Sequence, residues 1–278
     1  MKVLVTGANG YLGSHTVKGF LEKGIDVIAV AFNKDNIDPR AKFVFYDIFN
    51  SSKSIYSDLD YPDIVIHMAW KDGFKHNSHA HMEMLSSHYK FIEELIEGGL
   101  KRLIIMGSMH EIGYYEGAIN ENTPCNPSSM YGIAKDSLRR SVLLLAKQKG
   151  IKVQWLRAYY IYGDDIKSNS IFSKILAACQ EGKTSFPFST GKNKYDFIKI
   201  NDLTSQIVAV AMQDKVTGII ECCSGIPVSL STQVEKFIVE NNLGIKLEYG
   251  AFSDRPYDSP AIWGDNKKIL KIMRGYKK

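Results

Sequence analysis

Short runs of apolar residues alternate with longer amphipathic stretches through the first half of the chain. The strand-like runs, such as 27–30 and 64–66, are apolar throughout, which is typical of strands covered on both faces. We expect strands at 3–5, 27–30, 43–46, 64–67, 103–106 and 153–156, and helices at 17–23, 82–97 and 131–148. Strands that alternate with helices predict βαβ units, and therefore an α/β fold with a doubly wound parallel sheet.

After about residue 163 the pattern is less regular. Helices are expected at 171–180, 202–212 and 232–241, and strands at 219–222 and 247–249. No repeat, low-complexity tract or linker separates the two halves. We therefore expect a first domain at 1–163 and a smaller lobe at 164–278, of which about 195–215 returns to the first domain.

Composition and charge exclude several classes of protein. The 278 residues are 45% hydrophobic and 23% charged, which excludes a disordered chain. The net charge of +5 is scattered, so we expect no nucleic-acid partner. No run approaches the ~20 apolar residues of a membrane span, and the apolar run at the N-terminus is too short for a signal peptide. Four cysteines without CxxC spacing indicate reduced thiols, and we expect a cytoplasmic protein: Cys125, Cys179, Cys222 and Cys223.

A glycine-rich loop lies between the first strand and the first helix. Gly7, Gly10 and Gly13 follow Thr6 in GxxGxxG spacing. Glycine permits a tight turn and close approach of a pyrophosphate, and the following helix offers free N–H groups. In this strand–loop–helix context the loop predicts a dinucleotide site rather than a purely structural turn.

The end of the second strand bears on the choice of cofactor. An acid there binds the adenosine ribose and favours NAD, but Ala31 occupies the position. Asn33, Lys34 and Arg40 lie just beyond and are candidates for a 2′-phosphate, so we expect NADP or NAD, with NADP slightly favoured. The alternative is that Lys34 and Arg40 are solvated loop charges.

Three residues form a candidate catalytic set. Tyr131 and Lys135 lie four apart at the start of a helix and therefore share a face. A neighbouring ammonium is expected to lower the pKa of the tyrosine, so that it exchanges a proton with a carbinol oxygen as hydride moves at the attached carbon. Ser108 directly follows the fifth strand, where active sites of open α/β sheets lie.

With these motifs the chain resembles the extended short-chain dehydrogenase/reductase family, in particular the NAD-dependent epimerases and dehydratases that act on nucleotide sugars. Further motifs extend the resemblance over nearly the full length: Ile66-His67-Met68-Ala69, Glu121 through Pro127, Leu156-Arg157, Tyr162-Gly163 and Asp196-Phe197-Ile198. The resemblance implies that Ser108, Tyr131 and Lys135 are catalytic, that 1–163 binds the dinucleotide and that the lobe binds substrate. The residues expected near the cofactor are Gly7, Asn9, Gly10, Tyr11, Leu12, Gly13, Asn33, Lys34, Asp47, Ile48, Met68, Ala69, Tyr131 and Lys135.

The substrate side departs from the family pattern. Tyr160 stands where the family often has Asn, and Arg255 falls where members hold a sugar diphosphate. The family's dehydratases carry an Asp-Glu pair directly after the hydroxyl residue, whereas this chain has Met109-His110. Glu111 comes one place later and is expected to point elsewhere, which disfavours dehydration. His110 either contacts substrate or makes a structural bond in its loop.

Four histidines follow the fourth strand, at positions 76, 79, 81 and 88. Their spacing matches no metal motif, so we expect no metal and favour a loop at the mouth of the site.

Two reactions fit these observations. In the first, NAD(P)H reduces a 4-keto-6-deoxy nucleotide sugar, and Tyr131 is the general acid. In the second, a 4-epimerase with tightly bound NAD oxidises C4 and returns the hydride. A cofactor-sensing binding protein on the same fold is the third alternative. A homodimer through the helix that carries Tyr131 is expected by analogy only.

Overall fold

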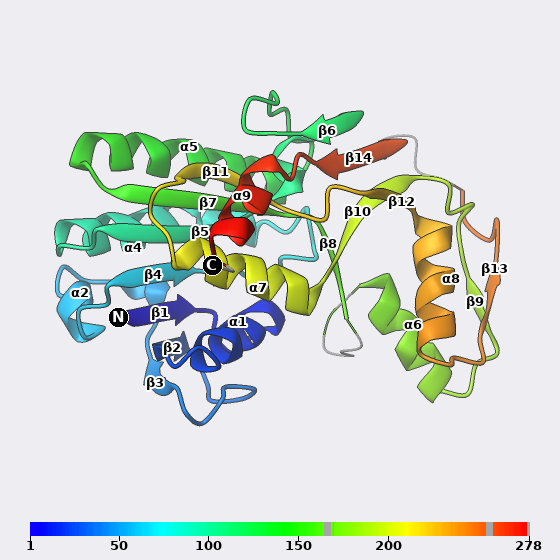
Figure 1. Cartoon of the computed structure of the whole chain (residues 1–278), viewed down its shortest axis with the longest axis horizontal. Coiled ribbons are helices and arrows are strands. Elements are labelled where there is room, and N and C mark those ends of the chain that lie inside the picture. The colour runs from blue at the N-terminus through cyan, green and yellow to red at the C-terminus, as the bar shows by residue number, and fades with distance from the viewer. Residues whose placement is uncertain (164–167, 169, 254–257, 277–278) are drawn as a thin grey trace.

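A seven-stranded sheet forms the centre of the computed structural model, which describes residues 1–163, 168, 170–253 and 258–276. All its strand pairs are parallel. In spatial order the strands are β11 (Gly218–Cys222), β7 (Lys152–Ala158), β5 (Arg102–Ser108), β4 (Ile64–His67), β1 (Lys2–Thr6), β2 (Asp26–Ala31) and β3 (Lys42–Phe45). The predicted doubly wound parallel sheet is confirmed (Figure 1).

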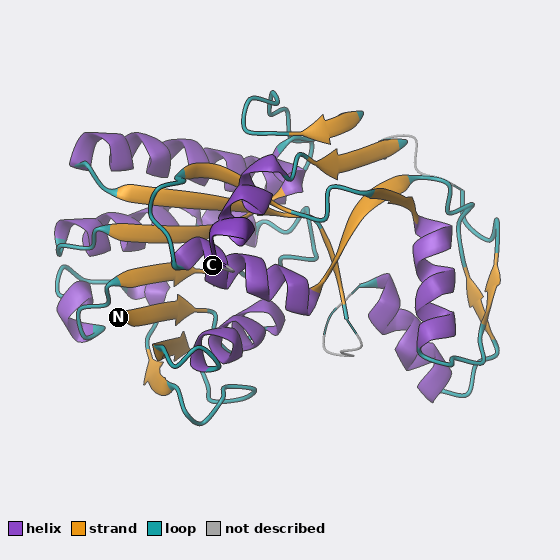
Figure 2. Cartoon of the chain, in the orientation of Figure 1, coloured by secondary structure: helices purple, strands orange, loops and turns teal. Residues whose placement is uncertain are grey.

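Helices cover both faces of this sheet, as Figure 2 shows. One buried apolar cluster joins the sheet to α1 (Tyr11–Leu21), α7 (Ile200–Ala211) and α9 (Lys267–Tyr276). A second joins it to α2 (Ile55–Asp58), α4 (Leu85–Glu97) and α5 (Met130–Lys149), while α3 (Ala80–Glu83) lies against α4 and α5. Strands buried on both faces explain why their sequences read as unbroken apolar runs.

Local signals set the ends of the two helices that matter most for the site. α1 begins at Tyr11, earlier than the expected 17–23, because the glycine loop leads directly into its first turn. α5 begins after Ser129, whose side chain accepts a hydrogen bond from the Gly132 backbone N–H, and it ends at Gly150 in the left-handed conformation. The functional motifs therefore sit at helix starts.

A second layer of short strands lies beyond the carboxyl ends of the main sheet (Figure 1). Its strands are β12 (Pro227–Ser229), β10 (Lys194–Lys199), β14 (Ala261–Gly264) and β6 (Gly117–Ile119), with β8 (Tyr160–Tyr162) on β10. β9 (Ser185–Pro187) and β13 (Lys246–Glu248) form a separate pair, and α6 (Ile171–Gln180) and α8 (Leu230–Glu240) pack nearby. Two 3-10 turns, η1 (Ile48–Asn50) and η2 (Met109–Glu111), follow β3 and β5.

The chain crosses between these two parts several times. α7 lies within the segment expected to return, but β11 pairs with β7 in the main sheet and α9 packs on α7. Asp196 links the parts: its buried carboxylate accepts hydrogen bonds from the backbone N–H groups of Ser224, Gly225 and Gly264 and from the Ser224 hydroxyl, at 2.7–3.2 Å. The functional division at 163 stays a prediction.

Across the described ranges, no helix combines the length and the apolar character needed to cross a bilayer. All four cysteines are free thiols, as their spacing predicted.

Candidate functional site

The glycine loop forms a close-packed cradle. Gly7 adopts φ +66°, which favours glycine, and a Cβ on Gly13 would lie 2.0 Å from the Gly7 carbonyl oxygen. Within the described residues, no side chain caps the start of α1 and its first turn holds no acid, so the helix N-terminus keeps free N–H groups and a positive potential. The cradle therefore fits the pyrophosphate of a dinucleotide.

The strand ends beside the loop bring the other predicted cofactor residues to the same edge. At the end of β4, Ala69 packs so closely that a Cβ on Gly7 would lie 2.8 Å from its Cα atom. Asp47 caps η1 by accepting a hydrogen bond from the Phe49 backbone N–H at 3.0 Å, and Ile48 is buried. Asn9 donates to the Asn33 side-chain oxygen at 2.8 Å, which ties the loop to the end of β2.

The cationic residues after β2 are engaged elsewhere. Arg40 forms a two-pronged pair with Asp38, at 2.9 and 2.7 Å, and this hydrogen bonding lowers the pKa of Asp38 to about 2. Lys34 is exposed and its ammonium lies 5.5 Å from the centre of the Phe43 ring. Ala31 is buried at the strand end, where it offers no carboxylate to a ribose.

A chain of hydrogen bonds runs beneath the cradle. The Thr6 hydroxyl accepts from the backbone N–H groups of Met68 and Ala69, so it donates to His67 Nδ1 at 2.9 Å. His67 Nε2 then carries the hydrogen and donates to His88 Nδ1 at 2.9 Å. Burial lowers the pKa of His67 well below its usual value and that of His88 to about 3. Both rings are therefore neutral at physiological pH.

Ser108, Tyr131 and Lys135 meet where β5 ends and α5 begins. Ser108 is buried at the last position of β5 and hydrogen-bonds the Tyr131 side chain. The Lys135 ammonium donates to the Met106 carbonyl oxygen at 2.7 Å and lies 5.9 Å from the centre of the Tyr131 ring. The spacing in the sequence thus brings together one hydroxyl, one phenol and one amine.

The expected lowering of the Tyr131 pKa is wrong for this arrangement. Burial raises the pKa of Tyr131 to about 12, although the Ser108 hydrogen bond opposes the rise. Burial also lowers the pKa of Lys135 to about 7, against the opposing effect of Glu111. The ammonium faces a carbonyl oxygen and an indole ring. It therefore does not stabilise the phenolate, contrary to the prediction. The phenol is therefore protonated and the lysine is close to its titration point.

Trp70 is a neighbour of this set that we did not predict. The Lys135 ammonium lies 3.7 Å from the centre of the Trp70 ring system, a cation–π contact. The indole also stacks on His88, with ring centroids 4.4 Å apart. The sequence signal was a large aromatic directly after the cofactor-lining segment that ends at Ala69.

The histidine-rich loop surrounds the phenol with rings. His76 stacks on Tyr131 at 5.3 Å, and its carbonyl oxygen accepts from the Tyr131 backbone N–H at 2.8 Å. His110 lies 4.3 Å from His76 and 6.0 Å from Tyr131, and burial lowers its pKa to about 4. His81 accepts from the Trp70 indole N–H and so donates through Nε2 to the Lys75 carbonyl oxygen. The described residues contain no group of three or more His, Cys, Asp or Glu suited to a metal.

The remaining predictions concern substrate contacts. Tyr160 lies in β8, with its ring 4.3 Å from that of Tyr195, at the start of the second layer. Glu111 does point elsewhere, as expected: its carboxylate contacts the Ser108 backbone, Trp155 and Arg157 rather than the phenol. Arg255 lies outside the described residues.

Comparison with known proteins decides the family. Residues 3–223 match the NAD dependent epimerase/dehydratase family. The chain belongs to this family. It is therefore an enzyme, and the predicted resemblance is confirmed. The family's description names NAD as the cofactor. A dinucleotide of this kind fits the glycine cradle described above.

Individual relatives match between 73% and 98% of the chain. The dTDP-6-deoxy-L-talose 4-dehydrogenase (NAD(+)) of Aggregatibacter actinomycetemcomitans is 44% identical over 95% of this chain and 99% of its own length. The Lactobacillus helveticus UDP-glucose 4-epimerase is 26% identical over 73% of this chain and 69% of its own. Among solved structures, the Thermotoga maritima UDP-glucose 4-epimerase with UDP-glucose matches with TM-score 0.83 at 22% identity, covering 98% of this chain and 92% of that one. That likeness confirms the fold.

Proposed function

We propose that this enzyme is an NAD-dependent oxidoreductase that interconverts the 4-keto and 4-hydroxyl forms of a 6-deoxyhexose carried on a nucleoside diphosphate. The observation that carries the proposal is the 44% identity, over nearly the full length of both chains, to a dTDP-6-deoxy-L-talose 4-dehydrogenase (NAD(+)). Among the reactions considered, reduction of a 4-keto-6-deoxy sugar is the one that agrees with this relative.

The proposed chemistry assigns one role to each member of the set. A bound nicotinamide supplies hydride to sugar C4 in the direction of reduction. Tyr131, protonated because burial raises its pKa to about 12, donates its hydroxyl proton to the C4 oxygen. Ser108 donates a hydrogen bond to the same oxygen, and Lys135 binds the nicotinamide ribose. In the oxidation direction the deprotonated Tyr131 oxygen accepts the proton from the C4 hydroxyl.

We assign the remaining predicted residues to binding. The glycine cradle holds the pyrophosphate, Asp47 and Ile48 flank the adenine, and Asn9 and Asn33 face the adenosine ribose. His110 and Tyr160 lie on the sugar side. We propose NAD rather than NADP, because Arg40 is already paired with Asp38 and the relative named above uses NAD(+). A cytoplasmic location and a homodimer stay predictions.

The test is a cofactor and substrate assay with the purified chain. We expect the enzyme to reduce a dTDP-4-keto-6-deoxyhexose with NADH in preference to NADPH. The loss of absorbance at 340 nm measures the rate. Tyr131→Phe should lower the rate by at least about 100-fold, because it removes the general acid, while NADH affinity stays the same. A wild-type rate in Tyr131→Phe would contradict the acid role.

The epimerase alternative keeps specific support in the Lactobacillus helveticus relative. It predicts NAD that co-purifies in one-to-one ratio, and conversion of UDP-glucose without net change at 340 nm. We would measure the nucleotide released on denaturation together with the two substrates. Stoichiometric NAD with UDP-glucose conversion would replace the proposal above.

A further inference from the structure

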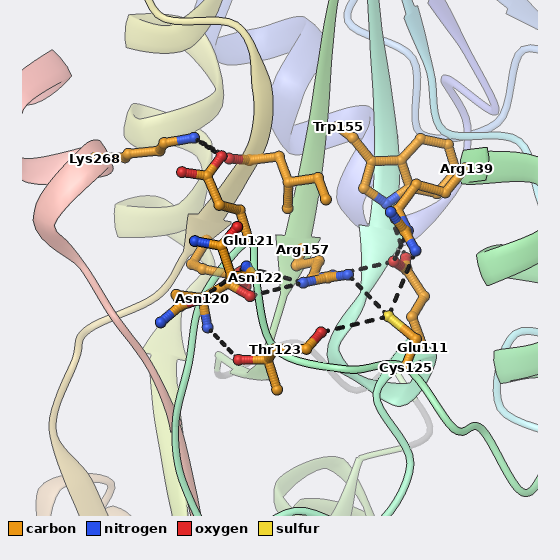
Figure 3. Close-up of polar contacts among 12 residues, drawn as sticks. Glu111, Asn120, Glu121, Asn122, Thr123, Cys125, Arg139, Trp155, Arg157 and Lys268 are labelled. Atoms are coloured by element: carbon orange, nitrogen blue, oxygen red, sulfur yellow. Dashed lines mark hydrogen bonds and ion pairs between the residues drawn. The ribbon is translucent and has the colours of Figure 1, made fainter. Parts of the chain in front are cut away.

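A buried carboxylate lies between the strand and the helix that carry the catalytic set. Glu111 is fully buried at the end of η2, one turn after Ser108. Its Oε1 atom accepts from the Ser108 backbone N–H at 2.8 Å and from the Trp155 indole N–H at 2.9 Å. Figure 3 shows the carboxylate facing Trp155, Arg139 and Arg157.

The first arm of this arrangement fixes Ser108. Glu111 holds the backbone N–H, while the Ser108 hydroxyl oxygen accepts from the His110 backbone N–H at 3.2 Å, which completes a reciprocal capping box. The close approach depends on Gly107, because a Cβ there would lie 2.5 Å from Glu111 Oε1. With its oxygen held in this way, the Ser108 hydroxyl stays beside Tyr131, where its hydrogen can be donated to the proposed substrate oxygen.

The second arm reaches α5. Glu111 Oε2 lies 3.4 Å from Arg139 Nε, and Arg139 follows Lys135 by one helical turn on the helix that begins with Tyr131. The same oxygen accepts from Arg157 Nε at 3.1 Å, and Arg157 is itself fully buried on β7. One carboxylate therefore joins β5, β7 and α5 just behind the catalytic set.

We propose that Glu111 is a positioning residue: its buried carboxylate fixes the Ser108 hydroxyl relative to the helix that carries Tyr131 and Lys135. The inference rests on the proposed function and extends it to a residue that does not touch the substrate. The buried charge of Arg157 does not need Glu111 as its partner, because the Glu221 carboxylate also pairs with Arg157 at 3.2 Å. Among the described residues, Glu111 contacts Arg157 and both catalytic elements, whereas Glu221 contacts neither Ser108 nor α5.

Glu111→Gln tests the proposal, with Glu221→Gln as a matched control. Both changes neutralise a buried carboxylate that binds Arg157, but only Glu111 contacts Ser108 and α5. The new amide has one acceptor oxygen, so it cannot serve the Ser108 N–H and the arginines together. We expect Glu111→Gln to lower kcat on the order of 100-fold with unchanged KM and NADH affinity, and Glu221→Gln to keep the wild-type kcat.

A double-mutant cycle separates positioning from a merely structural role. If Glu111 acts through Ser108, then Glu111→Gln should cost little further activity in a Ser108→Ala background. An equal loss of kcat in both backgrounds, or equal losses from Glu111→Gln and Glu221→Gln, would overturn the proposal. If Glu111→Gln does not fold, Arg139→Met removes the helix arm together with the Arg139 contacts to Asp136 and Cys125, and leaves Glu111 on Ser108. We expect a smaller fall in kcat in the same direction, and unchanged kcat would count against the inference.

Hydrogen exchange keeps the inference separate from the substrate assignment. Glu111→Gln should speed amide exchange in the peptides that cover 107–112 and 131–139, and Glu221→Gln should not. Wild-type protein that is inactive on 4-keto sugars would reject the proposed function, while this exchange pattern would still support the coupling. Unchanged exchange in both peptides would reject the coupling itself.

Discussion

At the residue scale, the protonation states in the site depend on burial and on which groups each charged side chain contacts. The sequence spacing correctly brought Tyr131, Lys135 and Ser108 together, but it could not predict the direction of the pKa shifts. Those shifts are set mainly by burial, with a smaller effect of the Glu111 charge, and both follow from packing that the spacing does not show. The Glu111 contacts were equally hidden, because they join segments far apart in the chain.

Ala31 offers a test of cofactor choice at a single residue. It is the last residue of β2, at 5% exposure, where a carboxylate would reach the adenosine ribose. Ala31→Asp should raise the ratio of NADH to NADPH affinity by about tenfold or more, because the acid accepts from ribose hydroxyls and repels a 2′-phosphate. Fluorescence titration with both cofactors measures the ratio. An unchanged ratio would mean that this strand end does not face the ribose.

At the element scale, strand ends and helix starts carry the function. The expected strand 64–67 and helix 171–180 coincide with β4 and α6, because buried apolar runs and a helical period are local signals. The three-residue strands β6, β8 and β12 were not predicted, since their pairing depends on distant partners. The sequence placed His67 of β4 in the family motif at 66–69 and His88 of α4 in the histidine group, and it did not show that the two rings share a hydrogen bond.

That chain of histidines predicts how stability depends on pH. His88 has a pKa of about 3 in the folded protein and about 6.5 when unfolded. The stability that comes from keeping His88 neutral is therefore fully present above pH 6.5 and is lost as the pH falls towards 3, by about 1.4 kcal/mol per pH unit for one proton. His88→Gln should remove that share of the slope between pH 6 and 4, measured by urea unfolding.

The exposed His79 is the control for this experiment. His79→Gln should leave the slope as in the wild type. Burial raises the pKa of Glu221 to about 7, so Glu221 acts in the opposite sense: it costs stability as the pH rises from about 4.5 to 7. An equal slope in His88→Gln and wild type would mean that His88 does not stay neutral in the folded protein.

At the scale of the whole molecule, the carboxyl ends of seven parallel strands face a second layer built mainly from the later chain (Figure 1). The sequence predicted this polarity, because βαβ units leave all strand ends on one edge. It did not predict that α9 returns to the main sheet, because the partners of its apolar face lie on α7 and β11, which are distant in the chain.

Ile269 tests whether α9 belongs to the main unit. It is buried against the first apolar cluster, whereas its neighbour Leu270 is 42% exposed. Ile269→Ala should lower the free energy of unfolding by about 2–5 kcal/mol, and Leu270→Ala by much less. Urea unfolding followed by far-UV circular dichroism would measure both. Equal effects would show that α9 is not packed as described.

The Asp196 carboxylate has a mechanical consequence. Its four hydrogen bonds come from the turn after β11 and from the end of β14, while Asp196 itself lies on β10. A rotation of the second layer over the strand ends would preserve these bonds only if its axis passed close to this side chain. Such a rotation would therefore pivot near Asp196, and β9 and β13, at the end of the second layer away from the main sheet (Figure 1), would sweep the longest arc.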